Sequence, residues 1–181
     1  MFVAGPLGVA LKTLLLVRHA KSSWEEPSLG DRERPLNGRG RRDAPRMGAL
    51  LRRLGQCPER ILSSDAVRAR ATALTMAEAA GFSGSIQFLR DLYEASPAGV
   101  LEAAARTDEP TTRLMIVGHN PGLEALVGRF VGQDLHFPTA AIAIIDLPIA
   151  AWRELGPATV ARAAKVVRPK DLRADGSGLG P

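Results

Sequence analysis

Short apolar runs that end in polar residues recur along the chain. The clearest are 13–18 (TLLLVR), followed by His19, and 113–117 (RLMIV), followed by Gly118-His119. Runs of this length are too short for a typical helix and favour strands that are buried on both faces of a sheet. Weaker runs of the same kind predict further strands at 61–62, 86–89, 140–147 and 160–167.

Helical stretches separate these runs, at 38–54, 66–80, 97–106 and 123–131. We expect Asn37 and Asp65 to cap the first and second helix, because their side-chain oxygens can accept the free amide hydrogens of a first turn. Pro121 suits the start of the fourth helix. Pro45 lies inside the first stretch, so the pattern predicts a kink there or a later start near Asp43.

The alternation of strands and helices predicts the fold class α/β. Crossover helices join parallel strands, so the expected architecture is a three-layer α/β/α sandwich with a mostly parallel central sheet. The carboxyl ends of parallel strands meet along one edge, where open sheets of this class bind ligands. The residues expected at that edge are Arg18-His19, Ser63-Ser64 leading to Arg68, and Gly118-His119-Asn120.

One domain accounts for the 181 residues, 45% of which are hydrophobic. We expect this domain at 12–170, between a ragged N-terminal leader at 1–11 and a flexible Gly-rich tail at 171–181. The apolar N-terminus lacks a basic region before it, which disfavours a signal peptide, and no later segment is long enough to span a membrane. Cys57 is the single cysteine, so no internal disulfide can form. These features predict a cytoplasmic protein with no membrane partner.

The net charge is +5 and the sequence pI is about 10.1, which suits a nucleic acid, a membrane surface or a phosphorylated substrate. A basic face in contact with solvent is the simpler explanation of this positive net charge. Residues 1–70 hold twice as many basic as acidic residues, so the excess belongs to the first part of the chain. One Tyr and two Trp offer few rings for stacking on bases, and we expect no nucleic-acid partner.

Two of the three histidines, His19 and His119, follow predicted strands at the same edge of the sheet. A histidine in such a place is by itself more often structural, but the neighbouring arginines change that balance. Arg18 precedes His19, and Arg68 lies near the start of a helix at the same edge. Guanidinium groups match phosphate oxygens two at a time, so these residues predict a phosphate-binding pocket.

Other chemistries do not fit the spacing of the residues. The chain has no His-x-x-x-His sequence and no cysteine pair, and arginines beside the histidines would repel a cation, so we expect no metal. Ser63 stands six residues after Cys57, where a cysteine phosphatase carries an arginine. No Walker sequence is present, and Gly38-Arg39-Gly40 does not continue to a dinucleotide fingerprint, so we expect no cofactor.

A histidine nucleophile remains. Neutral imidazole attacks phosphorus, and a phosphohistidine intermediate divides a difficult hydrolysis into two displacements. Nearby arginines disfavour the imidazolium form of His19, so we expect its pKa to lie below the usual value of about 6.5. Arg18, Arg68 and His119 would then surround the equatorial oxygens of the phosphoryl group.

The sequence LLLVRHAKSS at 14–23 resembles the signature of the histidine phosphatase superfamily, which has the phosphoglycerate-mutase-like fold. Its RHA form, in place of RHG, is similar to that of the short SixA-type phosphohistidine phosphatases. Further similar motifs follow in the expected order, and the resemblance covers about residues 12–170: RPLNGRG at 34–40, SDAVRARATA at 64–73, LYE at 92–94 and VGHNPG at 117–122.

The resemblance implies roles for single residues. Glu94 stands where some members carry a general acid, although a phosphorylated imidazole can leave protonated and needs less help than an alkoxide. Arg70 is expected nearer to solvent. The implied catalytic residues are Arg18, His19, Arg68 and His119, with Asn120 as a further phosphate ligand beside Arg18, Arg68 and His119.

These features predict a metal-independent phosphatase that hydrolyses protein phosphohistidine through an intermediate on His19. Its partner would be a phosphohistidine-bearing protein such as a phosphotransfer domain, because the chain has little room for a cap over the pocket. Two alternatives stay open. One is a phosphomonoesterase that acts on a small phosphorylated metabolite, and the other is a non-enzymatic module that binds anions or nucleic acid.

Overall fold

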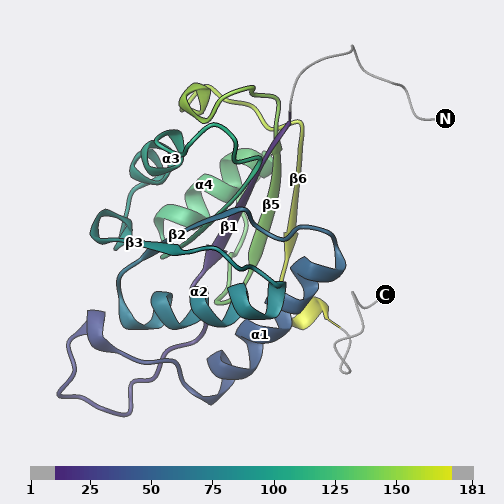
Figure 1. Ribbon diagram of the computed structural model, residues 1–181. Coiled ribbons are helices and arrows are strands. Elements are labelled where there is room, and N and C mark those ends of the chain that lie inside the picture. The colour runs from purple at the N-terminus through teal and green to yellow at the C-terminus, as the bar shows by residue number, and fades with distance from the viewer. Residues whose placement is uncertain (1–10, 173–181) are drawn as a thin grey trace.

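The computed structural model describes residues 11–172 and has a six-stranded sheet at its centre (Figure 1). The strands are β1 (Lys12–Arg18), β2 (Arg60–Ser64), β3 (Ile86–Leu89), β4 (Arg113–Gly118), β5 (Ile142–Leu147) and β6 (Ala163–Val167). Their order in the sheet is β3-β2-β4-β1-β5-β6. The first four strands of this order run parallel, whereas β5 is antiparallel to β1 and β6 is antiparallel to β5.

Two pairs of helices cover the sheet, α1 and α2 on one face and α3 and α4 on the other (Figure 1). The α-helices are α1 (Gly38–Arg53), α2 (Val67–Ala80), α3 (Pro97–Ala105) and α4 (Gly122–Val131). Short 3-10 helices are η1 (Asp31–Glu33), η2 (Arg90–Leu92), η3 (Trp152–Glu154) and η4 (Pro169–Asp171). The predicted three-layer α/β/α sandwich with a mostly parallel sheet is therefore confirmed.

Side chains of β1 alternate between the two layers, as the pleat of a strand requires. Leu14 and Leu16 pack into the core on the side of α3 and α4. Leu15 and Val17 pack into the core on the side of α1 and α2. All four are fully buried, which is the reason that this strand reads as a continuous apolar run.

All six predicted strands are present. The run at 140–147 enters the sheet only at Ile142, because Ala140 has a φ of 61° and extended backbone cannot contain this left-handed conformation. The last strand begins at Ala163 rather than at residue 160. Within the predicted tail, Asp171 ends η4 and Leu172 is buried in the core, and the rest of the tail lies outside the described residues, as does almost all of the predicted leader.

The predicted helix ends are correct in part. Asn37 caps α1, since its Oδ1 accepts a hydrogen bond from the Gly40 amide at 2.9 Å. Asp65 does not cap α2, because its carboxylate instead accepts a hydrogen bond from the Nε of Arg32 at 3.1 Å. Pro121 immediately precedes α4.

The expected late start of α1 near Asp43 is wrong, because the helix is continuous from Gly38 through Pro45. The continuous α1 helix packs closely against α2. A Cβ atom at Gly48 would lie only 2.4 Å from the carbonyl oxygen of Met76, so glycine is what lets the two helices approach. Burial of neighbouring side chains such as Met47 offsets the hydrogen bond that the proline cannot make.

The carboxyl ends of β1, β2 and β4 meet at one edge of the sheet. Arg18 pairs in register with Gly118, and the His19 amide donates to the Gly118 carbonyl at 3.0 Å. The sheet thus places the residues that follow β1 and β4 side by side.

Among residues 11–172, no helix is long and apolar enough to cross a membrane.

Candidate active site

His19 lies at this edge with its ring held in one tautomer. The residue is 8% exposed, and the Nδ1 of its ring lies 2.8 Å from the carbonyl oxygen of Ala20. A carbonyl accepts only, so Nδ1 carries the hydrogen and Nε2 holds a lone pair. The Nε of Arg68 donates to this Nε2 at 3.2 Å. The nucleophilic nitrogen therefore faces the predicted phosphate ligands.

The pKa of His19 is lowered to about 3. Burial is the largest cause, and the charges of His119, Arg68 and Arg18 add to it. The hydrogen bond to the Ala20 carbonyl acts in the opposite direction. The predicted direction is confirmed, although desolvation outweighs the arginines that the prediction relied on. At neutral pH the ring is unprotonated.

Arg68 connects the two histidines from the first turn of α2. Its side chain is 6% exposed, and its Nη2 lies 3.4 Å from the Nδ1 of His119. The same Nη2 donates to the carboxylate of Asp31 at 2.7 Å. One planar guanidinium thus contacts His19, His119 and an anion at the same time.

His119 is held from its other side by Ser64, the last residue of β2. Its Nε2 lies 2.8 Å from the Ser64 Oγ, and its ring centroid lies 4.9 Å from that of His19. Since Arg68 can only donate to Nδ1, Nε2 carries the hydrogen and donates to the serine. Burial, followed by the charge of Arg68, lowers the pKa of His119 to about 4. We refer to Arg18, His19, Arg68 and His119 as the histidine site.

Arg18 and Asn120 share one carbonyl oxygen, that of Phe137. The Nη1 of Arg18 donates to it at 2.9 Å and the Nδ2 of Asn120 at 3.0 Å. The buried Nε of Arg18 has no hydrogen-bond partner within residues 11–172, which leaves a donor for a ligand. Asn120 also donates to Glu124 at 3.0 Å, so both of its amide hydrogens are used. Its Oδ1, an acceptor, has no hydrogen-bond partner within residues 11–172, and Asn120 as a phosphate ligand stays a prediction.

Glu94 is not brought into the histidine site. It is exposed, has a φ of 52°, and makes no hydrogen bond or ion pair in the described part of the chain. Its neighbour Tyr93 points to the site instead, with its ring centroid 5.2 Å from that of His119. Arg70 is exposed, as expected.

Asp31, in η1, is a member of the site that sequence reasoning missed. Its carboxylate accepts hydrogen bonds from Arg34 at 2.6 Å, from Arg68 at 2.7 Å and from the Tyr93 hydroxyl at 2.7 Å. Burial would raise the pKa of Asp31, but these hydrogen bonds outweigh it and lower the pKa to about 2. The only sequence signal was its place three residues before Arg34 in the RPLNGRG motif.

The third histidine stays away from the other two. His136 is exposed, and its Nδ1 lies 3.4 Å from the carboxylate of Glu124. Within residues 11–172, no group of three or more His, Cys, Asp or Glu side chains is arranged to hold a metal ion.

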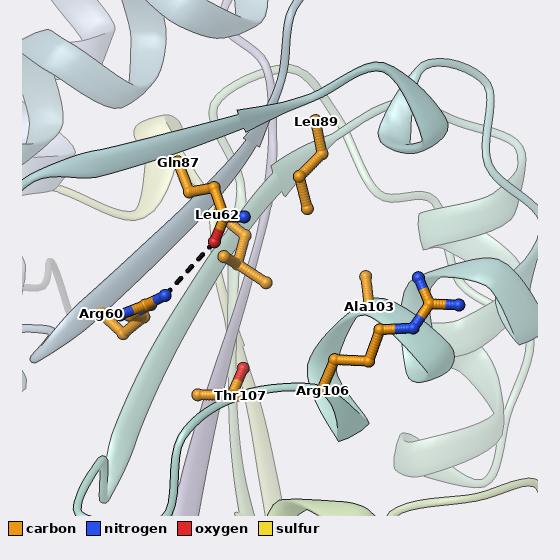
Figure 2. Close-up of a pocket in the computed structure, with 7 residues that line it drawn as sticks. All are labelled: Arg60, Leu62, Gln87, Leu89, Ala103, Arg106 and Thr107. Carbon is orange, nitrogen blue, oxygen red and sulfur yellow. Dashed lines mark hydrogen bonds between the residues drawn. The ribbon is translucent and has the colours of Figure 1, made fainter.

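A separate cavity of about 150 Å³ lies between β2, β3 and α3 (Figure 2). It contains no imidazole or carboxylate among its lining residues, and Arg60 on one side of it bonds to Gln87 at 3.3 Å. Arg60 and Arg106 are also paired with Asp108 and Glu102. Without a histidine in its lining, this cavity does not fit the predicted phosphoryl transfer to an imidazole.

The chain is similar to known proteins in sequence and in fold. The Histidine phosphatase superfamily (branch 1) matches residues 14–104. An uncharacterized chloroplastic protein of Arabidopsis thaliana is 32% identical over an alignment of 164 residues that covers 84% of this chain and 74% of that protein. An uncharacterized protein of Mycobacterium leprae is 34% identical over an alignment of 153 residues that covers 77% of this chain and 91% of that protein.

Solved structures have the same fold. The putative phosphohistidine phosphatase SixA from Agrobacterium tumefaciens is 32% identical, with a TM-score of 0.69 over 75% of this chain and 91% of that one. A protein histidine phosphatase SixA complexed with tungstate has a TM-score of 0.73 over 89% of this chain and 99% of that one, and at 22% identity it shows the fold alone.

These relatives confirm the phosphoglycerate-mutase-like fold and the resemblance to SixA-type proteins. The alternative of a non-enzymatic binding module is wrong, because the family and its site are those of a hydrolase. The chain belongs to the histidine phosphatase superfamily, and it is a phosphatase that uses a histidine as its nucleophile.

Proposed function

We propose that the protein hydrolyses phosphohistidine on a partner protein and that the Nε2 of His19 is the nucleophile. One observation carries the choice of nucleophile. The lone pair of that nitrogen faces a guanidinium at 3.2 Å, while the other ring nitrogen is held by the Ala20 carbonyl at 2.8 Å. The ring is thus oriented and unprotonated before substrate arrives.

In the first step, Nε2 of His19 attacks phosphorus, the bond from phosphorus to the substrate nitrogen breaks, and its electron pair stays on the departing imidazole. Arg68 and the unpartnered Nε of Arg18 donate to the phosphoryl oxygens. A bound phosphate dianion raises the pKa of His119, so that this ring can take up a second proton and donate from Nδ1. Water then attacks phosphorus, the bond from phosphorus to Nε2 of His19 breaks, and its electron pair returns to that nitrogen. Phosphate leaves with both hydrogens of the water.

Phosphohistidine is the proposed substrate for two reasons. The similar protein from Agrobacterium tumefaciens, at 32% identity, is a putative phosphohistidine phosphatase. In addition, Glu94 makes no hydrogen bond or ion pair with the histidine site within residues 11–172, and an alkoxide leaving group needs an acid more than an imidazole does. A phosphotransfer domain is the proposed partner, because it presents its phosphohistidine on an open protein surface.

Phosphate release from a phosphorylated phosphotransfer domain tests the proposal. The wild-type protein is expected to release phosphate, and His19→Ala to reduce the rate by about 1,000-fold or more. His136→Ala is the matched control and is expected to keep the wild-type rate, because that histidine is exposed and outside the site. The phosphoryl group trapped on the wild-type enzyme should be labile in acid and stable in alkali.

Steady turnover by His19→Ala would remove the proposed mechanism. A panel of small phosphomonoesters, run beside the phosphoprotein, tests the substrate. If an ester is turned over about ten times faster, as judged by kcat/KM, the protein substrate is wrong and the metabolite phosphatase is right.

A further inference from the structure

Asp31 lies at the entrance of the histidine site. Its side chain is 42% exposed, whereas the side chain of Arg68 is 6% exposed and His19 is 8% exposed. The guanidinium of Arg68 joins them, with its Nε toward His19 and its Nη2 toward Asp31. His19 therefore forms the floor of the site and Asp31 part of its rim.

The leaving group of the reaction must depart on the rim side. In an in-line displacement, the departing atom lies on the face of phosphorus opposite the attacking nitrogen. The attacking nitrogen is at the buried floor, so the departing group is directed toward solvent. Asp31 is the carboxylate that the structure holds against Arg68 on that side.

The carboxylate of Asp31 is an acceptor, with room for one further hydrogen bond. Its Oδ2 accepts from Arg68 and from the Tyr93 hydroxyl, and within residues 11–172 its Oδ1 accepts from Arg34 alone. Each ionised carboxylate oxygen can accept about two hydrogen bonds, so one lone pair on Oδ1 remains. Two of the three donors, Arg34 and Arg68, are positively charged and favour the ionised form, so at neutral pH Asp31 has no proton to give to a leaving group.

Asp31 is fixed in place by buried contacts. Arg34 is 7% exposed, donates to the Ser23 carbonyl at 3.0 Å, and lies 3.2 Å from the centre of the Trp24 ring. An isolated β-bridge between Ser22 and Leu36 closes the segment that carries them. A carboxylate held in this way is preorganised for a ligand.

We infer that Asp31 accepts a hydrogen bond from the ring N–H of the substrate's phosphorylated imidazole and thereby selects phosphorus–nitrogen over phosphorus–oxygen substrates. The inference rests on the proposed function and adds the residue that determines its selectivity. A phosphorylated imidazolium brings its own proton on the second ring nitrogen. An alkoxide would need a proton, which an ionised Asp31 cannot supply.

The balance of the step is simple. Nε2 of His19 forms a bond to phosphorus, the bond from phosphorus to the substrate ring breaks, and its electron pair neutralises the imidazolium. The proton on the other ring nitrogen stays there and remains hydrogen-bonded to Asp31. A neutral imidazole leaves, and no further reactant is needed.

Two peptides of identical sequence, one with phosphohistidine and one with phosphoserine, test the inference through kcat/KM. This constant covers only the steps up to phosphoryl transfer, so hydrolysis of the shared intermediate does not obscure the comparison. Asp31→Asn is expected to lower kcat/KM for the phosphohistidine peptide about 10- to 100-fold and for the phosphoserine peptide less than about threefold. Glu33→Gln, in the same 3-10 turn, is the matched control and should leave both values unchanged.

An equal loss on both peptides would overturn the inference, because Asp31 would then act only by positioning Arg68. An unchanged preference for phosphohistidine in Asp31→Asn would overturn it as well, while the proposed function would stand. Failure of the wild-type protein to act on phosphohistidine would instead remove the proposed function. Tyr93→Phe removes one of the three hydrogen bonds that hold the Asp31 carboxylate, and it leaves the buried contacts of that carboxylate in place. It should lower the ratio of kcat/KM for the phosphohistidine peptide to kcat/KM for the phosphoserine peptide, as Asp31→Asn does. This second variant keeps the test valid if Asp31→Asn fails to fold.

Discussion

The Nε of Arg68 lies 3.2 Å from the Nε2 of His19, the nitrogen that holds the ring's lone pair. A guanidinium and an unprotonated imidazole are both ready for a phosphoryl group, one as donor and the other as nucleophile. In the protein without substrate, they form a hydrogen bond with each other. A phosphate that enters must replace this hydrogen bond between Arg68 and His19. Substitution of Arg68 therefore gives the most direct test of the site.

Arg68→Lys should lower kcat/KM about 100-fold or more, because a single ammonium cannot reach His19, His119 and Asp31 in the fixed geometry of the guanidinium. Phosphate release from a phosphohistidine substrate measures the effect. Arg70→Lys is the matched control. Arg70 is exposed over the Phe88 ring at 3.9 Å, where a lysine can also lie, and activity should stay within about twofold. Activity in Arg68→Lys within about threefold of the wild type would contradict the assigned role.

Acid should weaken the fold through the two buried histidines. The pKa values are about 3 for His19 and about 4 for His119 in the folded protein, against about 6.5 in the unfolded chain. The unfolded state binds more protons below pH 6.5, so this stability is complete above pH 6.5 and is lost as the pH falls toward the folded values. Each imidazole is expected to cost about 2 kcal/mol of unfolding free energy between pH 7 and pH 5.

Urea denaturation at pH 7 and pH 5 measures this loss. His19→Gln should remove about half of it, because one of the two titrating groups is gone. His136→Gln should leave the pH dependence as it is, since His136 is exposed. The same pH dependence in His19→Gln and the wild type would show that burial of His19 is not linked to stability.

Glu94→Gln should change kcat/KM for a phosphohistidine substrate less than about threefold, because Glu94 makes no hydrogen bond to the histidine site within the described residues. A loss of about 100-fold would restore the general acid that the family resemblance implied. Asp91→Asn, on a neighbouring exposed residue, controls for the change in charge.

Gly48→Ala should destabilise the protein by about 2 kcal/mol, because the new methyl would lie 2.4 Å from the Met76 carbonyl oxygen and push α1 away from α2. Thermal denaturation measures the effect. Gly156→Ala is the control, since a Cβ atom there meets nothing within 4 Å among the described residues. Equal melting temperatures for the two variants would show that α1 and α2 can separate without cost.

The sequence by itself determined the strands and the meeting of the two histidines. β1 and β4 are continuous apolar runs, and short runs of this kind favour strands that are buried on both faces of a sheet. Parallel strands end at one edge, so the residues that follow them, His19 and Gly118-His119, had to lie together. Arg68 followed from its position at the start of α2.

Tertiary structure alone decided the rest of the site. Asp31 and Tyr93 contact Arg68 or His119 from two separate segments, and no periodicity marks the segment that carries Asp31. Asp65 stands at a position where the sequence predicts a helix cap, but its carboxylate forms an ion pair with Arg32 instead. Local patterns report whether a residue is buried and in which element, whereas the partner of a charged side chain depends on which segments the completed fold brings together.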